Sequence, residues 1–429
     1  MTFDLRAKNA MKKHLEEILT NLKFADDTID WESFKNDTMS ALTKEILEKK
    51  KDYLTLGNIY KIIFENIFYE AKRKKTSGSP ILSGSLQSII GGEQLNILIN
   101  KINKFFASIP RSYFVYFPLP MLPEVDKKEI LLNDQIALVR PPKKKKVSTY
   151  AGRADTLVNA ILGEIPSEQF EMYVRITSKG YAEPSLKDIP ITKALSVFKQ
   201  IVYLGIIEKI FIEREVRLSF SGLKSPVKFC FVIDHDKPEE EKFFTLPSNI
   251  TNFILGFEIA NRSSEEKLLG LSVSGIKKII NVFRKHEKFF NAPEDDEDAE
   301  PIKTAVEWAF ESTINENETF AYIQMCIALD SILGLRLRDK GKKNKPEESE
   351  EPRSLTETIA DRGAYLLSEN IKGRKNIHGK LKDILRLRGK LVHGKSMRLK
   401  DEERNFLRLG KSYLGRVILK ELSFFKTIE

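Results

Sequence analysis

The sequence predicts an α+β protein, in which an N-terminal region of mixed helices and a mainly antiparallel sheet is followed by an all-α helical bundle. Apolar residues recur at helical spacing near both ends, short β-branched and aromatic runs lie in the middle, and an acidic segment with two prolines precedes the bundle. With 429 residues, 41% hydrophobic and 31% charged, the chain can form two or three domains with buried cores.

Residues 1–106 are expected to form an N-terminal helical region. Apolar positions such as Ile18, Ile46 and Ile63 fall at helical spacing, and polar turns separate these groups. The Gly/Ser-rich segment 76–92 breaks the pattern and predicts a hinge or loop. A further helix is predicted over 93–106.

Residues 107–290 are expected to form an α+β sensing or regulatory domain. The runs SYFVYF, EILLNDQIALV, MYVRI and VKFCFVIDH are short, aromatic or β-branched, and bounded by Pro, Gly or Asp, as is typical of strands. A helix is predicted over 191–203.

The acidic segment 291–301, NAPEDDEDAEP, predicts a linker, because its composition departs sharply from that of both flanks. The remainder, 302–429, is expected to be a helical domain. Its predicted helices cover 302–315, 317–336, 354–369, 374–392 and 401–426.

The positive charge of the chain is concentrated near its end. Residues 371–429 hold 17 Lys and Arg against six Asp and Glu, a net charge of +11, whereas the whole chain carries +10. The first 370 residues therefore sum to −1. Such a basic region attracts polyanions, although a solvated helical face rich in Lys is the simpler interpretation.

The chain is expected to be cytoplasmic and not to contact a membrane. No uninterrupted apolar run reaches the roughly 18 to 20 residues of a membrane span, and the first residues lack the apolar stretch of a secretory signal. Cys230 and Cys326 lie in apolar surroundings, which suits a reducing compartment and predicts no disulfide framework.

The helix predicted over 374–392 contains an arginine in its apolar stripe. Leu381, Ile384, Leu385 and Leu391 follow helical spacing, and Arg388 occupies a place where that spacing calls for an apolar residue. A buried guanidinium is costly unless it meets a carboxylate, a phosphate or solvent. Arg388 therefore indicates a site, unless it reaches solvent or pairs with an acid such as Asp330 or Asp361.

His393 follows Arg388 by five residues, which on a regular helix rotates the two side chains apart by about 140°. Two arrangements bring them together. Either the helix ends near Val392, with Gly394 tolerating a positive φ, or a second copy of the chain supplies the partner. A helix C-terminus also favours protonated histidine.

The C-terminal region, from about 302 to 425, resembles the Apea-like branch of the HEPN superfamily, which includes many prokaryotic RNA-cleaving toxins and anti-phage defence effectors. The resemblance depends on the Arg-x4-His signature of Arg388 and His393 in LRLRGKLVHG, on SLTETIADRGAYLL, and on FAYIQMCIALDSILG. One position departs from the pattern: Gly389 stands where catalytic members carry a polar residue.

The resemblance implies a metal-independent endoribonuclease with no cofactor, formed as a homodimer whose two motifs share one cleft. Arg388 and His393 would be catalytic, and Asp330 would orient one of them. RNA, with tRNA among the candidates, would be the substrate, and an antitoxin or a phage-derived trigger a further partner. The basic residues that would hold phosphates are Arg386, Lys390, Lys395 and Arg398.

Other interpretations compete with this one. Gly389 favours a non-catalytic HEPN-like module that binds RNA or protein. The letters GKLVHGKS match a phosphate-binding loop, but a helix rather than a strand precedes them. Asp234, His235 and Asp236 resemble metal ligands, but side-chain alternation along a strand would turn His235 away from both acids. Arg362 is expected to pair with an acid inside the bundle.

Overall fold

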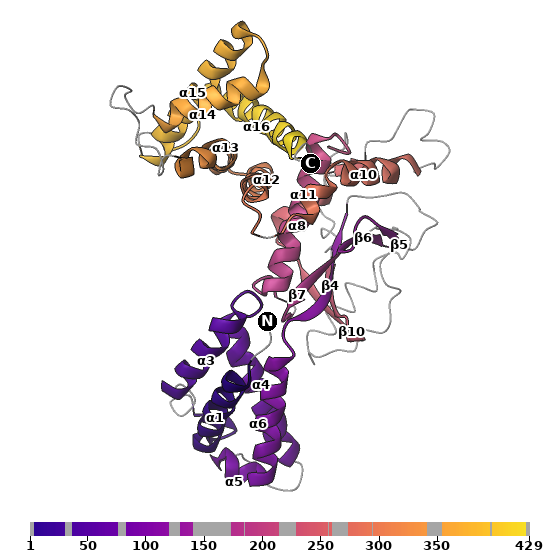
Figure 1. Ribbon diagram of the computed structural model, residues 1–429, viewed down its shortest axis with the longest axis vertical. Coiled ribbons are helices and arrows are strands. Elements are labelled where there is room, and N and C mark those ends of the chain that lie inside the picture. Colours follow the sequence, from indigo (N-terminus) through magenta and orange to yellow (C-terminus); the bar gives the residue numbers. More distant parts are fainter. Residues whose placement is uncertain are drawn as a thin grey trace, which may run out of the picture. The chain divides into compact units, whose positions relative to one another are not determined.

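The computed structural model of the chain describes residues 4–30, 37–75, 83–119, 129–139, 173–183, 185–213, 229–255, 257–259, 273–293, 295–340, 354–394 and 397–425. The chain divides into two compact units (Figure 1), and each unit draws on three separate stretches of sequence. Unit 1 comprises Met1–Val115, Thr177–Ala194 and Phe231–Phe244. Unit 2 comprises Tyr116–Ile176, Leu195–Cys230 and Thr245–Glu429.

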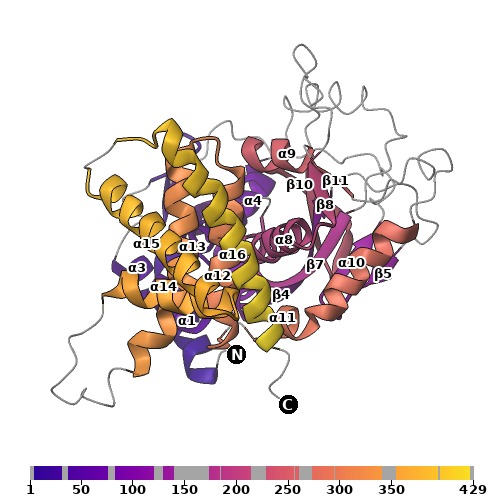
Figure 2. The same cartoon turned by 90° about the horizontal axis from the view of Figure 1, so that it is seen from above.

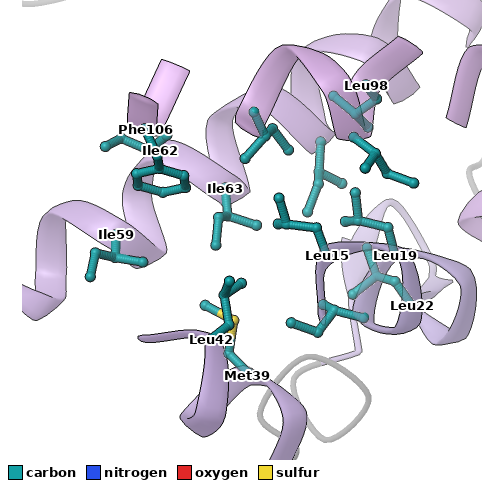
Figure 3. Close-up of a cluster of buried hydrophobic side chains, with 14 of the residues drawn as sticks. Leu15, Leu19, Leu22, Met39, Leu42, Ile59, Ile62, Ile63, Leu98 and Phe106 are labelled. Carbon is teal, nitrogen blue, oxygen red and sulfur yellow. The ribbon is translucent and has the colours of Figure 1, made fainter. Parts of the chain in front are cut away.

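Helices build most of the N-terminal part of unit 1. They are α1 (Leu5–Asn21), α3 (Asp37–Lys50), α4 (Leu56–Lys75), α5 (Leu86–Ile90) and α6 (Gly92–Ala107). Asp4 caps α1, because its carboxylate accepts a hydrogen bond of 2.7 Å from the Ala7 N–H. Apolar side chains of α1, α3, α4 and α6 meet in one core (Figure 3), which includes Leu15, Leu19, Met39, Leu42, Ile59, Ile63, Leu98 and Phe106.

One expectation for this region was wrong. The Gly/Ser-rich segment does not form a loop throughout, because β3 (Gly84–Ser85) pairs with β1 (Lys23–Ala25) and α5 follows directly. β1 also pairs antiparallel with β2 (Thr28–Ile29). Phe24, which continues the apolar spacing of the first helix, lies on β1, and its side chain is buried.

Among the described residues, the largest sheet has the strand order β10-β9-β4-β7-β6-β5. The strands β5, β6 and β7 pair antiparallel, with Leu138 opposite both Ile130 and Val174. β4, β7, β9 and β10 each contribute residues to both units. The four predicted runs are confirmed as strands, with the bounds β4 (Arg111–Pro118), β5 (Glu129–Leu131), β6 (Ile136–Val139), β7 (Tyr173–Gly180) and β9 (Phe229–Asp234); EILLNDQIALV forms both β5 and β6. The sequence did not predict β10 (Lys237–Thr245).

The helix predicted over 191–203 is α8 (Ile189–Ile207), which is longer than expected. Among the described residues, α8 alone has the length and composition of a membrane span, and 56% of that stretch is buried in the protein. Its unit 2 portion packs inside that unit: Phe198 stacks on Phe117 at 4.8 Å between ring centroids, and Lys199 Nζ lies 2.6 Å from Glu311 Oε1.

Unit 2 also contains several short elements. β8 (Phe211–Glu213) pairs antiparallel with β11 (Phe257–Ile259). The helices α9 (Ser248–Leu255), α10 (Val273–Lys285) and α11 (Glu287–Asn291) follow the sheet strands in the chain. Phe253 of α9 meets Phe310 edge to face, at 5.5 Å between ring centroids.

The C-terminal helices of unit 2 agree with the prediction. They are α12 (Ala299–Ile314), α13 (Glu318–Lys340), α14 (Leu355–Leu367), α15 (Ile371–Val392) and α16 (Arg404–Phe424). α12 packs on α13, α14 packs on α15, and α16 contacts all four of these helices (Figure 2). The acidic segment 291–301 lies within unit 2, and its last three residues form the first turn of α12.

Arg362 of α14 joins three helices of the bundle. Its Nη2 donates to Glu421 Oε1 of α16 at 2.5 Å, and its Nη1 donates to the Leu333 carbonyl of α13 at 3.2 Å. Glu421 is only 4% exposed. The expected pairing of Arg362 with an acid in the bundle is confirmed, and it supplies the counter-charge that a buried carboxylate needs.

Removing one partner of this pair should destabilise the protein. We expect Arg362→Ala to lower the free energy of unfolding by about 3 kcal/mol, because it leaves the Glu421 carboxylate buried without its cation. Urea denaturation of the purified chain measures the change. Arg408→Ala, which removes an exposed arginine of α16, is the matched control and should change stability by less than about 0.5 kcal/mol. Equal losses for the two variants would contradict this role.

Candidate functional site

The candidate site lies where α15 packs on α13 in unit 2 (Figure 2). The Tyr322 hydroxyl of α13 donates to the Ile384 carbonyl of α15 at 2.8 Å, and both side chains are fully buried. The apolar stripe of α15 faces this contact, since Leu381 and Leu385 are buried as well. This hydrogen bond and the buried stripe therefore fix the position of α15 on α13.

Arg388 continues that stripe and meets an acid of α13. Its Nη1 donates a hydrogen bond to Asp330 Oδ2, which makes an ion pair between the two helices. The side chains are 32% and 21% exposed, so the pair lies at the margin of the core. Of the two acids that the sequence left open, Asp330 is the partner, whereas Asp361 lies 3.3 Å from His378 Nε2.

His393 lies at the end of α15, where the helix stops as the sequence predicted. The helix ends at Val392, His393 is its C-cap residue, and Gly394 adopts a φ of +70°. The His393 N–H still donates to the Gly389 carbonyl at 3.1 Å, so the backbone remains close to helical up to this residue. The imidazole is exposed beyond the last turn, and the ion pair of Arg388 lies one turn earlier.

The surface around Gly389 and Gly394 is open in the part of the chain that the structure describes. A Cβ atom placed at Gly389 or at Gly394 would have no described heavy atom within 4 Å, apart from its immediate neighbours. At Gly394 the positive φ suits glycine in particular. At Gly389 no described atom excludes a side chain.

The predicted phosphate-binding residues are exposed where the structure describes them. Arg386 and Lys390 project from α15, and Arg386 Nη1 lies 4.0 Å from Asp383 of the same helix. Arg398 is exposed in the segment after α15, and Lys395 lies outside the described residues. The Leu399 N–H donates to Thr319 Oγ1 at 2.9 Å, which ties this segment to the start of α13.

Thiol chemistry and a metal site find no support in the described residues. Burial raises the pKa of the Cys326 thiol, which lies one helical turn before Asp330, and it also raises that of Cys230. No group of three His, Cys, Asp or Glu is placed to hold a metal within the described ranges. The expectation that Asp234, His235 and Asp236 alternate along a strand was wrong, because His235 and Asp236 form the turn between β9 and β10.

Sequence reasoning missed a second candidate region, a cavity of about 190 Å³ in unit 1. Its lining residues come from α4, α6, β4, the segment after β7, and the β9–β10 hairpin. These segments are far apart in the chain, so no spacing rule along the sequence links them. The high density of charged residues in β10 was the one local signal.

Comparison with protein-family models, with curated proteins and with solved structures gave no match for this chain.

Replacing the Arg388–Asp330 pair should separate a structural role from a functional one. We expect Arg388→Leu combined with Asp330→Leu to leave the free energy of unfolding unchanged within about 1 kcal/mol, because apolar residues can replace a partly buried ion pair without loss. Asp330→Leu alone should lower the free energy of unfolding by about 1 to 2 kcal/mol, because it removes the acceptor of the partly buried guanidinium. A double variant less stable than the single one, in chemical denaturation, would show that the pair serves stability.

Proposed function

We propose that the protein is a metal-independent endoribonuclease of the HEPN type, which cleaves RNA through the 2′-hydroxyl in a composite site formed by two copies of the chain. The observation that carries the proposal is the arginine in the stripe of α15. It is held by Asp330, remains one-third exposed, and is followed by an exposed histidine at the end of the helix.

The electrostatics of this pair suit an anionic transition state. Asp330 engages one guanidinium nitrogen, and the exposed part of Arg388 offers a planar cation to the charge that develops on a phosphorus centre. Because Asp330 fixes the direction of the guanidinium, little reorganisation is needed when that charge appears. The pair thus supports a role in stabilising the transition state.

Histidine supplies the proton transfers of such a reaction. A base removes the 2′-hydroxyl proton, the 2′-oxygen attacks the adjacent phosphorus, and the P–O5′ bond breaks as an acid protonates the leaving 5′-oxygen. The products are a 2′,3′-cyclic phosphate and a 5′-hydroxyl. DNA lacks the attacking hydroxyl, so the mechanism selects RNA.

One chain provides one histidine in this motif, whereas the reaction uses a base and an acid. An isologous dimer through the C-terminal helices would bring two copies of His393 and Arg388 to one cleft. The open surface around Gly389 and Gly394 leaves room for the second copy or for the RNA strand. Arg386, Lys390 and Arg398 are exposed, which is what contacts to phosphates along the strand require.

The proposed setting is a cytoplasmic toxin or anti-phage effector, with RNA as substrate. In this setting the region before α12 responds to an antitoxin or a phage-derived trigger and so controls the nuclease. The resemblance of 302–425 to the HEPN family supports this setting.

A non-catalytic HEPN-like module is the second candidate function. Two observations favour it: Gly389 replaces the polar residue of catalytic members, and Asp330 neutralises part of the charge of Arg388. In this case the exposed basic residues of α15 would hold RNA or an acidic protein without cleaving it.

Cleavage of total RNA by the purified protein in EDTA tests the proposal. We expect a product ending in 2′,3′-cyclic phosphate, and a loss of roughly 10²- to 10⁴-fold in rate for His393→Ala, because a proton-transfer group is removed. Arg388→Ala should lose activity similarly. Both variants should keep the elution volume and circular dichroism of the wild-type dimer.

His235→Ala is the matched control, since it removes an exposed histidine outside the helical region and should cleave at the wild-type rate. Binding of RNA without cleavage by the wild-type protein would support the second candidate. Undiminished cleavage by both the Arg388 and the His393 variants would dispose of the catalytic assignment.

A further inference from the structure

The cavity of unit 1 has the size of a small-molecule site. Its volume is about 190 Å³, and all of its lining residues belong to unit 1. An engineered cavity of about 150 Å³ accepts benzene. The unit 1 cavity therefore has room for a molecule somewhat larger than benzene, such as a free amino acid. Ile62, which belongs to the core of unit 1 (Figure 3), forms part of the wall.

One side of the cavity is aromatic. The rings of Phe105 and Tyr181 meet edge to face at 5.6 Å between centroids, and Tyr113 lies in the same wall. Both tyrosines are buried. Burial raises the pKa of Tyr113 to about 12 and raises that of Tyr181 as well, so both hydroxyls stay neutral at physiological pH. This wall suits the apolar or aromatic part of a ligand.

A positively charged group borders the aromatic wall. The Arg111 guanidinium lies over the Phe105 ring, 4.5 Å from its centroid, and its Nη1 is 3.4 Å from Asp234 Oδ2. Its Nη2 and Nε donate to Ser108 Oγ at 3.2 Å. Arg111 is thereby held in one orientation, and a guanidinium fixed in this way is suited to bind a carboxylate through two parallel hydrogen bonds.

A negatively charged group lies on the same cavity. Glu183 Oε1 accepts a hydrogen bond of 2.7 Å from the Tyr181 hydroxyl, and Lys242 Nζ lies 3.3 Å from the same oxygen. Lys61 Nζ is 3.5 Å from Glu183 Oε2. Burial alone would raise the pKa of Glu183, but the hydrogen bond from Tyr181 and the two lysines outweigh it and lower that pKa. Glu183 is thus a carboxylate at neutral pH, able to bind an ammonium group.

The ion pairs around the cavity are long. The contacts of Arg111 with Asp234 and of Glu183 with its two lysines measure 3.3 to 3.5 Å, longer than the roughly 2.7 to 2.9 Å of a strong charge-assisted hydrogen bond. Groups at such distances keep capacity for a ligand that carries both charges. A nucleotide or free phosphate fits poorly, because acids outnumber bases among the lining residues Glu65, Glu183, Asp234, Glu240, Arg111, Lys237 and Lys242.

We propose that this cavity binds a small zwitterion of the free α-amino acid class. The ligand carboxylate pairs with Arg111, its ammonium group pairs with Glu183, and its side chain packs on Phe105, Tyr113 and Tyr181. The site belongs to unit 1 and does not depend on the nuclease proposal.

Calorimetric titration of the full-length protein with each of the standard free L-amino acids tests the proposal. We expect at least one of them to bind, with a preference for apolar or aromatic side chains. Its N-acetyl derivative lacks the positive charge and its amide lacks the negative one, so each should bind at least about tenfold more weakly, as expected when one charge-assisted contact is lost. Absence of binding by every amino acid, or equal binding of either derivative, would overturn the proposal.

Two substitutions test whether the ligand binds in this cavity. Arg111→Gln should weaken binding of the free amino acid and leave binding of its amide unchanged, because the amide lacks the carboxylate. Glu183→Gln should weaken binding of the free amino acid and leave binding of its N-acetyl derivative unchanged, because that derivative lacks the ammonium group. Arg111→Lys serves as a second variant should Arg111→Gln fold poorly; it keeps the positive charge but loses the two parallel donors of the guanidinium, so it should also weaken binding. Arg73→Gln removes an arginine of unit 1 that does not line the cavity, and it should bind as the wild type does. Wild-type affinity in both cavity variants would place the ligand elsewhere and overturn the assignment.

Discussion

A guanidinium in the apolar stripe of α15 requires a carboxylate within reach on α13. Arg388 stands in the apolar stripe of α15, and a cation there is tolerated because Asp330 projects from α13 to meet it. The same register allows the Tyr322 hydroxyl to reach the Ile384 carbonyl. The two polar contacts together fix how far one helix is advanced along the other, and apolar contacts alone specify that position less sharply. The direction of the Arg388 side chain follows from this register.

The helical region could be predicted well from the sequence because its signals are local. Helical spacing located α12 to α16 within a few residues, and glycine chemistry at Gly394 located the end of α15. The pairing of Arg388 with an acid could also be foreseen, since a charge in an apolar stripe demands a partner. Which acid it would be could not be foreseen: Asp330 and Asp361 were equally plausible in sequence, and the packing of α13 against α15 decides between them.

The remaining features arise from contacts between distant segments. The short strand β3 and helix α5 lie in a stretch whose composition indicates a loop, and pairing with β1 overrides that preference. His235 and Asp236 were assigned to a strand, but the chain reverses there and starts β10. Arg111 and Glu183 are 72 positions apart and line one cavity, which no periodicity could reveal. The acidic composition of 291–301 predicted a linker, and in the structure this segment belongs to unit 2.

The division of unit 1 into three stretches has a consequence for how the chain is made. Its last stretch ends at Phe244, so the ribosome must synthesise more than half of the chain before unit 1 has all of its strands. Long-range strand pairing is slow, and an incomplete sheet exposes open edges to other chains in the meantime. By the same order of synthesis, the amino-acid cavity would be complete before the ribosome reaches Arg388. A nascent chain would thus carry the proposed amino-acid site before it carries the proposed nuclease site.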